Sequence, residues 1–442
     1  MKPLIVTITT ALLLGLAASS PSGVDEQWTQ AELEAASRKI QGEIEELRAT
    51  KFIRPVKVEL SDGDQFLAYM QARIAKMQRE EDLVADEIIA KHLGLIPPDL
   101  DLLALTMEVL EEQVGGFYAP GTDTFYLMES FTGGLARIIL AHELTHALDD
   151  QLFDLDALLE ERSASGDAEM AFSAVVEGSG TVVMSRWAMR NLGDLNLEDL
   201  QQASKMGMET LSSSPPFVWK PLLAIYVRGQ AFLEAGRKHL KKLAKQAGEE
   251  PDANLAIEMA FANPPRSTEQ ILHPDKYWKV DEQDEPRPIR HAIDELPEGW
   301  KLMQRDVMGE LVTALFTETL DDRVNPDLTN QLALLAIRYT NQAAEGWGGD
   351  ELVLLGNGSG HLVHWVTVWD TERDAREFRA AVKELEPHLA TSLRALSGGV
   401  GGTSGTRLSD GADARTVALA LWSGVASGEL GVLLDALRYE EL

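Results

Sequence analysis

The spacing of apolar and polar residues predicts a mainly helical N-terminal part. Residues 63–93 carry apolar side chains at helical intervals and are predicted to form one long amphipathic helix. Residues 54–60 alternate like a short strand, and residues 116–130 (GFYAPGTDTFYLMES) predict a β-hairpin around a Pro-Gly turn. Residues 263–300 are rich in proline, charge and tryptophan and look like extended chain laid over a surface. The other helices predicted in this part span residues 25–50, 99–113, 135–152, 167–191 and 222–245, with a loop at 212–221.

The pattern changes near residue 301, where short strands and helices follow one another. Residues 397–411, rich in glycine, serine and threonine, are predicted to be flexible, and residues 347–350 to form a tight turn. We therefore expect an α+β protein, with a mainly helical domain over residues 20–300 and an α+β domain over residues 301–442. The strands predicted in the second domain are 351–355, 361–369 and 415–421, and the helices are 306–319, 326–344, 371–396 and 427–438.

The start of the chain has the pattern of a secretory signal. Residues 1–19 (MKPLIVTITTALLLGLAAS) place one lysine before an apolar run and a group of small residues, with a cleavage point near Ala17-Ala18-Ser19. A retained anchor is the alternative, but the run is shorter than the ~20 residues that a membrane-spanning helix needs. We expect a secreted or periplasmic bacterial protein with no integral membrane span after cleavage.

The composition limits the classes of function that are open to the chain. Its 442 residues include 71 acidic and 40 basic side chains, and the formal net charge of −31 disfavours binding to nucleic acids or anionic lipid surfaces. There is no cysteine, which excludes disulfides, thiolate metal ligands, iron–sulfur clusters and cysteine nucleophiles. A metal bound by this protein must therefore be held by histidine and carboxylate side chains.

One motif carries a specific chemistry. His142, Glu143 and His146 form an HExxH pattern within a mainly apolar helical stretch. Positions i and i+4 lie on one face of a helix, so the two imidazoles can bind one zinc ion. Glu143 projects about 100° further round the helix, where its carboxylate can act on a metal-bound water without being a ligand. A pair of satisfied core histidines is the alternative interpretation.

Zinc needs a third protein ligand. Leu152 stands six residues after His146, where a third histidine would define the metzincins, so that class is excluded. Glu177 is the candidate, because it is a lone carboxylate in an apolar helical stretch and needs a cation if it is buried. The neighbouring Gly178 and Gly180 suggest close packing of another helix, which we take to be the HExxH helix. A structural buried ion pair is the alternative role for Glu177.

Other residues near the motif have less specific roles. Asp149 or Asp150 could orient a ligand histidine through a hydrogen bond, or could belong to a charged exposed face. Residues 125–128 of the predicted hairpin could be a sheet edge along which substrate lies as an added strand. His361 and His364 fall on opposite faces of a predicted strand and are interpreted as structural.

A family resemblance covers most of residues 35–390. The stretch GGFYAPGTDTFYLMES…LAHELTHALDDQLFDL…AVVEGSGTVV resembles an uncharacterised family of secreted bacterial proteins with the signature GFYdp…HELTHALQDQ…EGdAt, which groups with gluzincin-like zinc metallopeptidases. PPRSTEQILHPDKY (264–277) and AAEGWGGDELVL (343–354) also resemble that family. The resemblance implies a zincin-like catalytic domain in which His142, His146 and Glu177 bind zinc and Glu143 is the general base.

The chain departs from the family pattern at two places. Asp149 stands where the family usually has glutamine, and Ser179-Gly180 where it usually has Asp-Ala. Neither departure changes a zinc ligand or the general base.

Together the motif and the resemblance predict a secreted zinc metallopeptidase whose partner is a peptide or protein substrate. Zinc-bound water attacks the peptide carbonyl, and Glu143 takes its proton and passes it to the leaving amine. The oxyanion needs a further donor, for which His273 is the first choice and a structural role is the alternative; the other candidates are Tyr118, Tyr226 and Tyr277. The rival function is a non-catalytic extracytoplasmic binding or scaffold protein that keeps the fold, although such a protein would not need Glu143.

Overall fold

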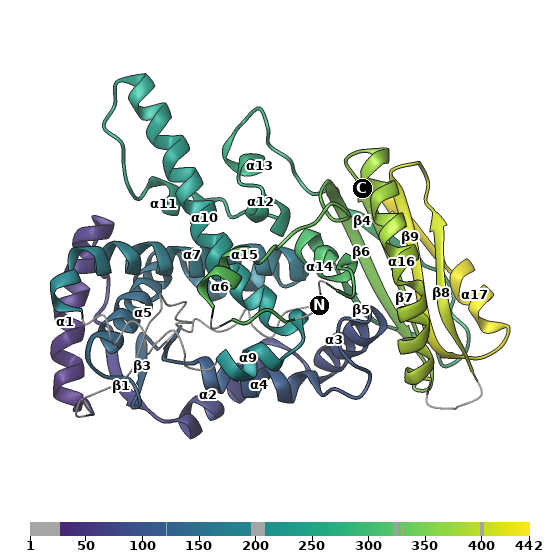
Figure 1. Cartoon of the computed structure of the whole chain (residues 1–442), viewed down its shortest axis with the longest axis horizontal. Helices are drawn as coiled ribbons and strands as arrows, with labels where there is room; N and C mark the ends of the chain where they lie inside the picture. Colours follow the sequence, from purple (N-terminus) through teal and green to yellow (C-terminus); the bar gives the residue numbers. More distant parts are fainter. Residues whose placement is uncertain are drawn as a thin grey trace.

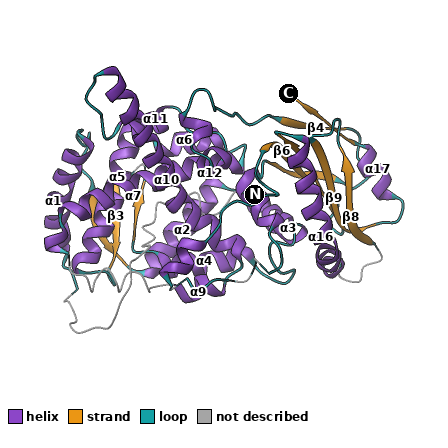
Figure 2. Ribbon diagram, turned by 45° about the horizontal axis from the view of Figure 1, so that its top comes forward, coloured by secondary structure: helices purple, strands orange, loops and turns teal. Residues whose placement is uncertain are grey.

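The computed structural model describes residues 27–442 except position 121, residues 196–207, positions 322, 324 and 329, and residues 398–401. The signal-like residues 1–19 lie outside this part. Figure 1 shows an elongated molecule with a helical part at one end and a β-sheet at the other. In Figure 2 most strands gather in that sheet, while a few lie among the helices. The protein is therefore of the α+β class, as expected.

The helical part is formed by the chain up to Trp278, and several of its helices begin at side chains that cap them. Thr29 and Glu32 form a capping box at the start of the first helix, and Ser165 accepts a hydrogen bond from the backbone N–H of Ala168. The helices are α1 (Gln30–Arg48), α2 (Gly63–Met77), α3 (Glu80–His92), α4 (Leu102–Gln113), α5 (Gly133–Phe153), α6 (Leu155–Arg162), α7 (Gly166–Arg190), α9 (Met208–Ser213), α10 (Pro216–Ala247), α11 (Leu255–Ala262), α12 (Thr268–Leu272) and α13 (Asp275–Trp278), with a 3₁₀ turn at Leu192–Asp194.

Two helix boundaries differ from the sequence prediction. The single helix expected over residues 63–93 is wrong, because Gln78 is extended and Asp82 accepts hydrogen bonds from the backbone and guanidinium of Arg79, which starts the separate helix α3. Helix α10 begins at Pro216, inside the predicted loop 212–221. Proline suits the first turn of a helix, because its fixed φ is already helical and its missing N–H has no partner there.

A three-stranded sheet packs beside α5. Its strands are β1 (Lys57–Ser61), β2 (Gly116–Ala119) and β3 (Thr124–Met128), in the order β1-β3-β2. The predicted hairpin is confirmed as β2 and β3, but residues 125–128 are not a sheet edge. Leu127 pairs with Gly116 on one side and with Leu60 of the parallel strand β1 on the other. Strands β1 and β2 form the two edges of this sheet.

The second part of the chain builds a five-stranded antiparallel sheet in the order β5-β6-β7-β9-β8, with a separate ribbon of β10 and β4. Helix α16 lies along one face of the sheet (Figure 1). The elements are β4 (Ile289–Ile293), β5 (Lys301–Asp306), α14 (Gly309–Thr317), α15 (Gln331–Ala336), β6 (Trp347–Gly356), β7 (His361–Trp369), α16 (Glu372–Leu396), β8 (Thr403–Asp410), β9 (Thr416–Val425), α17 (Glu429–Asp435) and β10 (Leu437–Glu441).

Both faces of the central strands are buried. Leu352 and Leu354 of β6 join the large core that includes α16 and the helical part, whereas Val353 and Leu355 face a second cluster with α17 and β10. Every residue of β6 is buried, although only Leu352–Leu355 form an apolar run in the sequence. The start of the strand carries two glycines and two acidic residues, so the sequence pattern located the strand at 351–355 and missed its first residues.

Three predictions for the second part are wrong. Among the described residues of the predicted helix 326–344, only α15 is helical. Residues 347–350 begin strand β6 instead of forming a tight turn, and a β-bulge between Trp347 and Gly349 accounts for the glycines. Of the residues 397–411 predicted to be flexible, 398–401 lie outside the described part, and strand β8 takes up residues 403–410, in which Gly405 lies against the Trp422 ring of the neighbouring strand.

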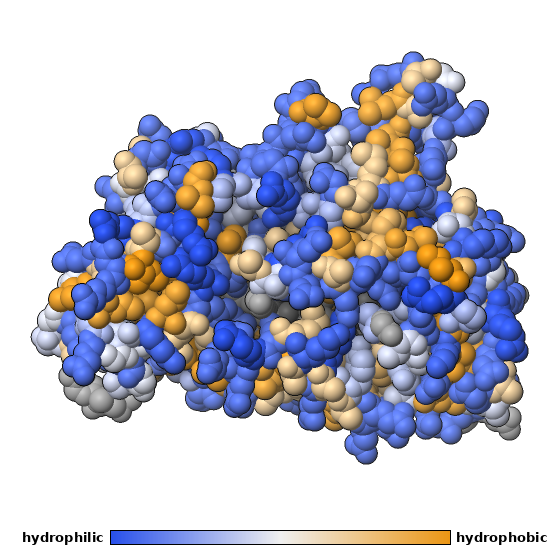
Figure 3. Space-filling model, turned by 180° about the vertical axis from the view of Figure 1, so that it is seen from behind, coloured by the Kyte–Doolittle hydropathy of each residue, from blue (hydrophilic) through white to orange (hydrophobic). Residues whose placement is uncertain are grey.

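The two parts of the chain are closely joined. Strand β4 precedes the predicted boundary at residue 300, yet it pairs with the C-terminal strand β10. One apolar cluster runs from the helical part to one face of the sheet. The face of the molecule in Figure 3 is mostly hydrophilic with scattered apolar patches. Among the residues described, none of the helices is both long and apolar enough to cross a membrane.

Buried carboxylates hold the start of α7 against the second part. Asp306 at the end of β5 accepts a hydrogen bond from the backbone N–H of Gly166 (2.7 Å). Asp167 accepts hydrogen bonds from the backbone N–H of Thr268 (3.0 Å) and from its hydroxyl (2.5 Å). Burial raises the pKa of Asp167 to about 7, against the weaker lowering effect of these bonds.

This pKa predicts a specific dependence of stability on pH. The folded protein retains a proton on Asp167 that the unfolded chain releases above pH 3.8, so the stabilising effect of protonation is lost as the pH rises towards 7. The expected slope is up to about 1.4 kcal/mol per pH unit. Asp167→Asn removes the titration and keeps an oxygen that can accept from Thr268.

Denaturant unfolding of the wild type and of Asp167→Asn at several pH values between 5 and 7 measures this difference. We expect the free energy of unfolding to decline less steeply in the variant. Asp413→Asn, which changes an exposed carboxylate, is the control and should leave the slope unchanged. Equal slopes in wild type and Asp167→Asn would contradict the prediction.

Candidate metal centre

The motif helix α5 runs through the helical part and is buried along almost its whole length. The side chains of His142, Glu143 and His146 lie on it, and these residues are 1%, 0% and 0% exposed. Thr145 between them donates its hydroxyl to the carbonyl of Ala141 (2.8 Å). Ionisable side chains this deep in an apolar helix are costly unless they have compensating partners.

Glu177 of α7 meets the two histidines, as the sequence led us to expect. His142 Nε2 lies 2.8 Å from His146 Nε2, and Glu177 Oε2 lies 3.1 Å from the first nitrogen and 3.4 Å from the second. The three ligand atoms all lie within 4.8 Å of one another, close enough to hold one metal ion. Two imidazole nitrogens and one carboxylate oxygen are the donor set of many catalytic zinc sites.

The protonation states suit metal binding. Burial lowers the pKa of His142 and the neighbouring His146 lowers it further, which favours the neutral imidazole that acts as a ligand. Burial acts in the opposite sense on Glu177, but the His146 and His142 rings outweigh it and hold the pKa of this carboxyl below its usual value. A neutral His142 imidazole and an ionised Glu177 carboxylate are the forms in which these two side chains bind a metal.

Glycines allow the helices around the cluster to approach closely. A Cβ on Gly180 would lie 2.7 Å from Cε1 of His142 and 2.9 Å from Cε1 of His146. A Cβ on Gly178 would lie 2.5 Å from the carbonyl carbon of Gly229 in α10, and one on Gly229 would overlap the carbonyl of Ala174. The prediction that Gly178 and Gly180 mark a close helix contact is confirmed, although Gly178 faces α10 and only Gly180 faces α5.

The residues that follow the motif anchor α5 to its neighbours. Asp149 accepts hydrogen bonds from Arg48 of α1 and from Ser179 of α7, the latter at 2.6 Å. Asp150 accepts from the hydroxyl of Tyr118 (2.9 Å), which ties α5 to β2. The structure therefore gives both aspartates partners other than the ligand histidines, and Asp149 is fully buried rather than part of an exposed face.

Gln151 completes this group of anchors. Its side-chain oxygen accepts hydrogen bonds from the backbone N–H groups of Ile53 (2.8 Å) and Arg54 (3.0 Å), and its amide donates to Asp123 (3.1 Å) in the hairpin turn. The three polar residues 149–151 thus connect the motif helix to α1, α7, the hairpin and the chain leading to β1.

The candidate donors to the oxyanion differ in how far they lie from the histidine–glutamate cluster. His273 contacts Glu310 of α14 (2.9 Å), and among the described residues no hydrogen bond or ring contact joins it to the histidine–glutamate cluster. Tyr277 donates its hydroxyl to the carbonyl of Asn263 (2.6 Å), and Tyr118 is bound to Asp150. These contacts favour structural roles for all three side chains.

Tyr226 of α10 is the candidate that reaches the cluster. Its ring stacks on that of His142, with centroids 6.0 Å apart and an angle of 26° between the planes. The residue is 2% exposed. Sequence reasoning named it only as an alternative, because nothing in the primary pattern shows that α10 packs beside the motif helix.

A second group of possible metal ligands already has a cation of its own. Ligand atoms of Glu269, Asp284 and Asp370 also lie within 4.8 Å of one another. Lys276 donates to all three, at 2.5, 2.7 and 3.0 Å. An ammonium at the centre of three carboxylates satisfies their charge, so this group is a structural network.

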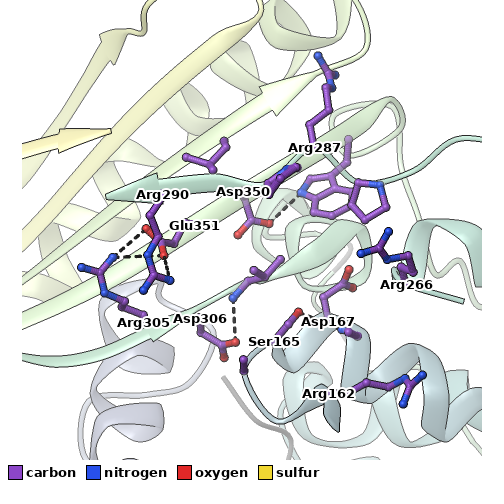
Figure 4. A pocket seen from close by; sticks show the side chains of 18 of the residues that line it. Arg162, Ser165, Asp167, Arg266, Arg287, Arg290, Arg305, Asp306, Asp350 and Glu351 are labelled. Atoms are coloured by element: carbon purple, nitrogen blue, oxygen red, sulfur yellow. Dashed lines mark hydrogen bonds and ion pairs between the residues drawn. The ribbon is translucent and has the colours of Figure 1, made fainter. Parts of the chain in front are cut away.

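A cavity of about 520 Å³ lies between the start of α7 and the second part of the chain (Figure 4). Its charged side chains have hydrogen-bond or ion-pair partners, some of them outside the cavity, such as Asp370 for Arg287. Glu351 contacts Arg290 (3.3 Å) and Arg305 (3.2 Å), and Asp350 accepts from the indole N–H of Trp347 (2.8 Å). Neither of the two possible metal clusters in the described residues lines this cavity.

Comparison with known families finds a match in the second part of the chain. Residues 300–424 match a family model described as a domain of unknown function (DUF8575). No curated protein and no solved structure matches the chain. The matched segment contains the five-stranded sheet and α16 but none of the residues of the metal centre. The interpretation of the metal centre therefore rests on its geometry and on the motif.

The close contact between α7 and α10 predicts a large effect of one methyl group. Gly229→Ala places a Cβ on the carbonyl of Ala174, so α10 must move away from α7. We expect the free energy of unfolding to fall by about 1–3 kcal/mol, the usual cost of overpacking. Gly42→Ala is the matched control, because this glycine lies in α1 with nothing within 4 Å of the new Cβ.

The control should raise stability by roughly 0.5–1 kcal/mol, the usual gain from replacing glycine by alanine inside a helix. Denaturant titrations of both variants followed by circular dichroism measure the two changes. A Gly229→Ala variant as stable as the wild type would show that the helices are not in the contact described.

Proposed function

We propose that this protein is a zinc-dependent peptidase whose catalytic centre is formed by α5 and α7. The observation that carries the proposal is the convergence of His142, His146 and Glu177 in a buried cluster, with Glu143 on the same helix. The proposed zinc ligands are those three side chains. A bound zinc ion would polarise the substrate carbonyl and make an attacking water more acidic.

Glu143 is the proposed general base. It follows the first ligand directly on α5, so its side chain leaves the helix beside the ligand row rather than within it. Its carboxylate is among the charges that act on Tyr69, whose pKa is raised to about 12, chiefly by burial. In a site shielded from bulk water, this carboxylate accepts the proton of the attacking water and delivers it to the departing amine.

Tyr226 is the proposed donor to the developing oxyanion, in place of His273. Its ring stacks on His142, whereas His273 contacts Glu310. A tyrosine hydroxyl held in a desolvated site is an effective donor to negative charge that develops on a carbonyl oxygen. The proposed substrate is a peptide or protein.

The first test separates the peptidase from a non-catalytic scaffold. Glu143→Gln keeps the shape of the side chain but cannot accept a proton, so we expect zinc binding to persist and peptide cleavage to fall by about 10²–10⁴-fold. Zinc is measured by elemental analysis of the purified protein, and cleavage with casein and a peptide library.

His142→Ala is the companion variant and should lose both zinc and activity. Stoichiometric zinc without cleavage by the wild type would support the scaffold. Absence of zinc from wild type purified in its presence would reject the proposed metal centre.

A second test compares the two candidate donors. Tyr226→Phe keeps the ring against His142 and removes only the hydroxyl, so we expect kcat to fall by about 10²-fold with zinc content unchanged. His273→Asn should change kcat less than threefold, since the ring contacts Glu310 rather than the cluster. The opposite ranking of the two variants would restore His273 as the donor.

A further inference from the structure

A buried ion pair lies beside the metal centre and joins three helices. Arg48, the last residue of α1, donates from Nη1 to Oδ1 of Asp149 in α5, and the two side chains are 1% and 0% exposed. Ser179 of α7 donates its hydroxyl to the other oxygen of the same carboxylate (2.6 Å). Asp149 therefore connects α1 to α7 through both of its oxygens.

The positions of these residues align them with the metal ligands. Asp149 follows His142 by seven residues and His146 by three, so all three side chains lie on one face of α5. From the facing helix α7, Ser179 contacts Asp149 and Glu177 contacts the two histidines. The ion pair and the ligand cluster therefore lie on the same α5–α7 contact, about one helical turn apart on α5.

We propose that Arg48, Asp149 and Ser179 are positioning residues that set the separation of α5 and α7, and so the affinity of the centre for zinc. This inference rests on the proposed function. Because Arg48 belongs to the N-terminal helix α1, high-affinity metal binding also requires α1 to be docked against α5. None of the three side chains is a ligand; they act through the helices that carry the ligands.

Attachment of α1 does not itself require this ion pair. Leu33, Ile40 and Ile44 of α1 are buried in the large apolar core. Glu43 accepts a hydrogen bond from the indole of Trp187 in α7 (2.6 Å). Apolar side chains in place of a buried ion pair often stabilise a protein equally well, so a buried pair is better explained by the geometry it imposes. Hydrogen bonds are directional, so bonds to both oxygens of one carboxylate fix how the three helices are aligned along one another. Apolar contacts alone would allow the helices to slide.

The test measures zinc affinity and stability separately. Ser179→Ala removes one bond with little risk to folding, and the double variant Arg48→Met with Asp149→Asn removes both charges together and leaves no lone buried charge. Trp187→Phe is the matched control, since it removes a hydrogen bond between α1 and α7 ten residues along from Glu177. Zinc dissociation constants come from competition with a chelator, and stabilities from unfolding of the metal-free proteins.

We expect Ser179→Ala and the double variant to weaken zinc binding by roughly 10–100-fold, as substitutions next to metal ligands commonly do. The control should change zinc affinity less than threefold even where it costs as much stability. Zinc binding by the wild type with unchanged affinity in both test variants would overturn the inference and leave the proposed function standing. A loss of affinity that follows stability equally in the control would also overturn it, whereas a wild type that binds no zinc would reject the proposed function and the inference together.

Discussion

The cluster of His142, His146 and Glu177 depends on how closely α7 approaches the helices on either side of it. Gly180 lets α7 come against the two imidazoles, and the contact of Gly178 with Gly229 brings α10 equally close on another side. Without this spacing the Glu177 carboxylate could not reach both histidine nitrogens, and Tyr226 could not stack on His142. The geometry of the site therefore requires small residues in α7 and α10. The close contacts that they permit offset the free-energy cost of placing glycine inside a helix.

The carboxylate that joins α5 to α7 lies on the motif helix itself. Asp149 of α5 accepts a hydrogen bond from the hydroxyl of Ser179 in α7, and these are two of the positions at which the sequence differs from the pattern that it resembles. Arg48 of α1 balances the charge of Asp149. In this protein a carboxylate on α5 and a neutral donor on α7 therefore hold the two helices together.

The sequence predicted the parts of the site that depend on local geometry. The HExxH spacing placed two imidazoles on one helix face, and the apolar surroundings of Glu177 singled it out as their partner. Contacts between distant segments were not predictable in this way. Arg48 and Asp149 are 101 positions apart in the chain, and neither carries a local pattern that names the other.

Pairing between strands that are far apart in the sequence was equally unpredictable. Residues 125–128 were recognised as a strand, but their central place in the sheet depends on pairing with β1, far earlier in the chain. The ribbon of β4 and β10 joins residues on both sides of the predicted domain boundary. Alternation and turn residues identify a strand and its hairpin partner, whereas the partner on the other edge is selected by packing of the whole core.

Two of the buried carboxylates of helix α7 have pKa values that move in opposite directions. Asp167 in its first turn is bound by the hydroxyl and N–H of Thr268, which are neutral, and burial therefore dominates and raises its pKa to about 7. Glu177 is equally buried, but its partners are imidazoles, and these outweigh burial and lower its pKa. The partner, and not the depth of burial, decides which carboxylate holds a proton near neutral pH. The first carboxylate consequently suits a contact between the two parts of the chain, and the second suits a metal ion.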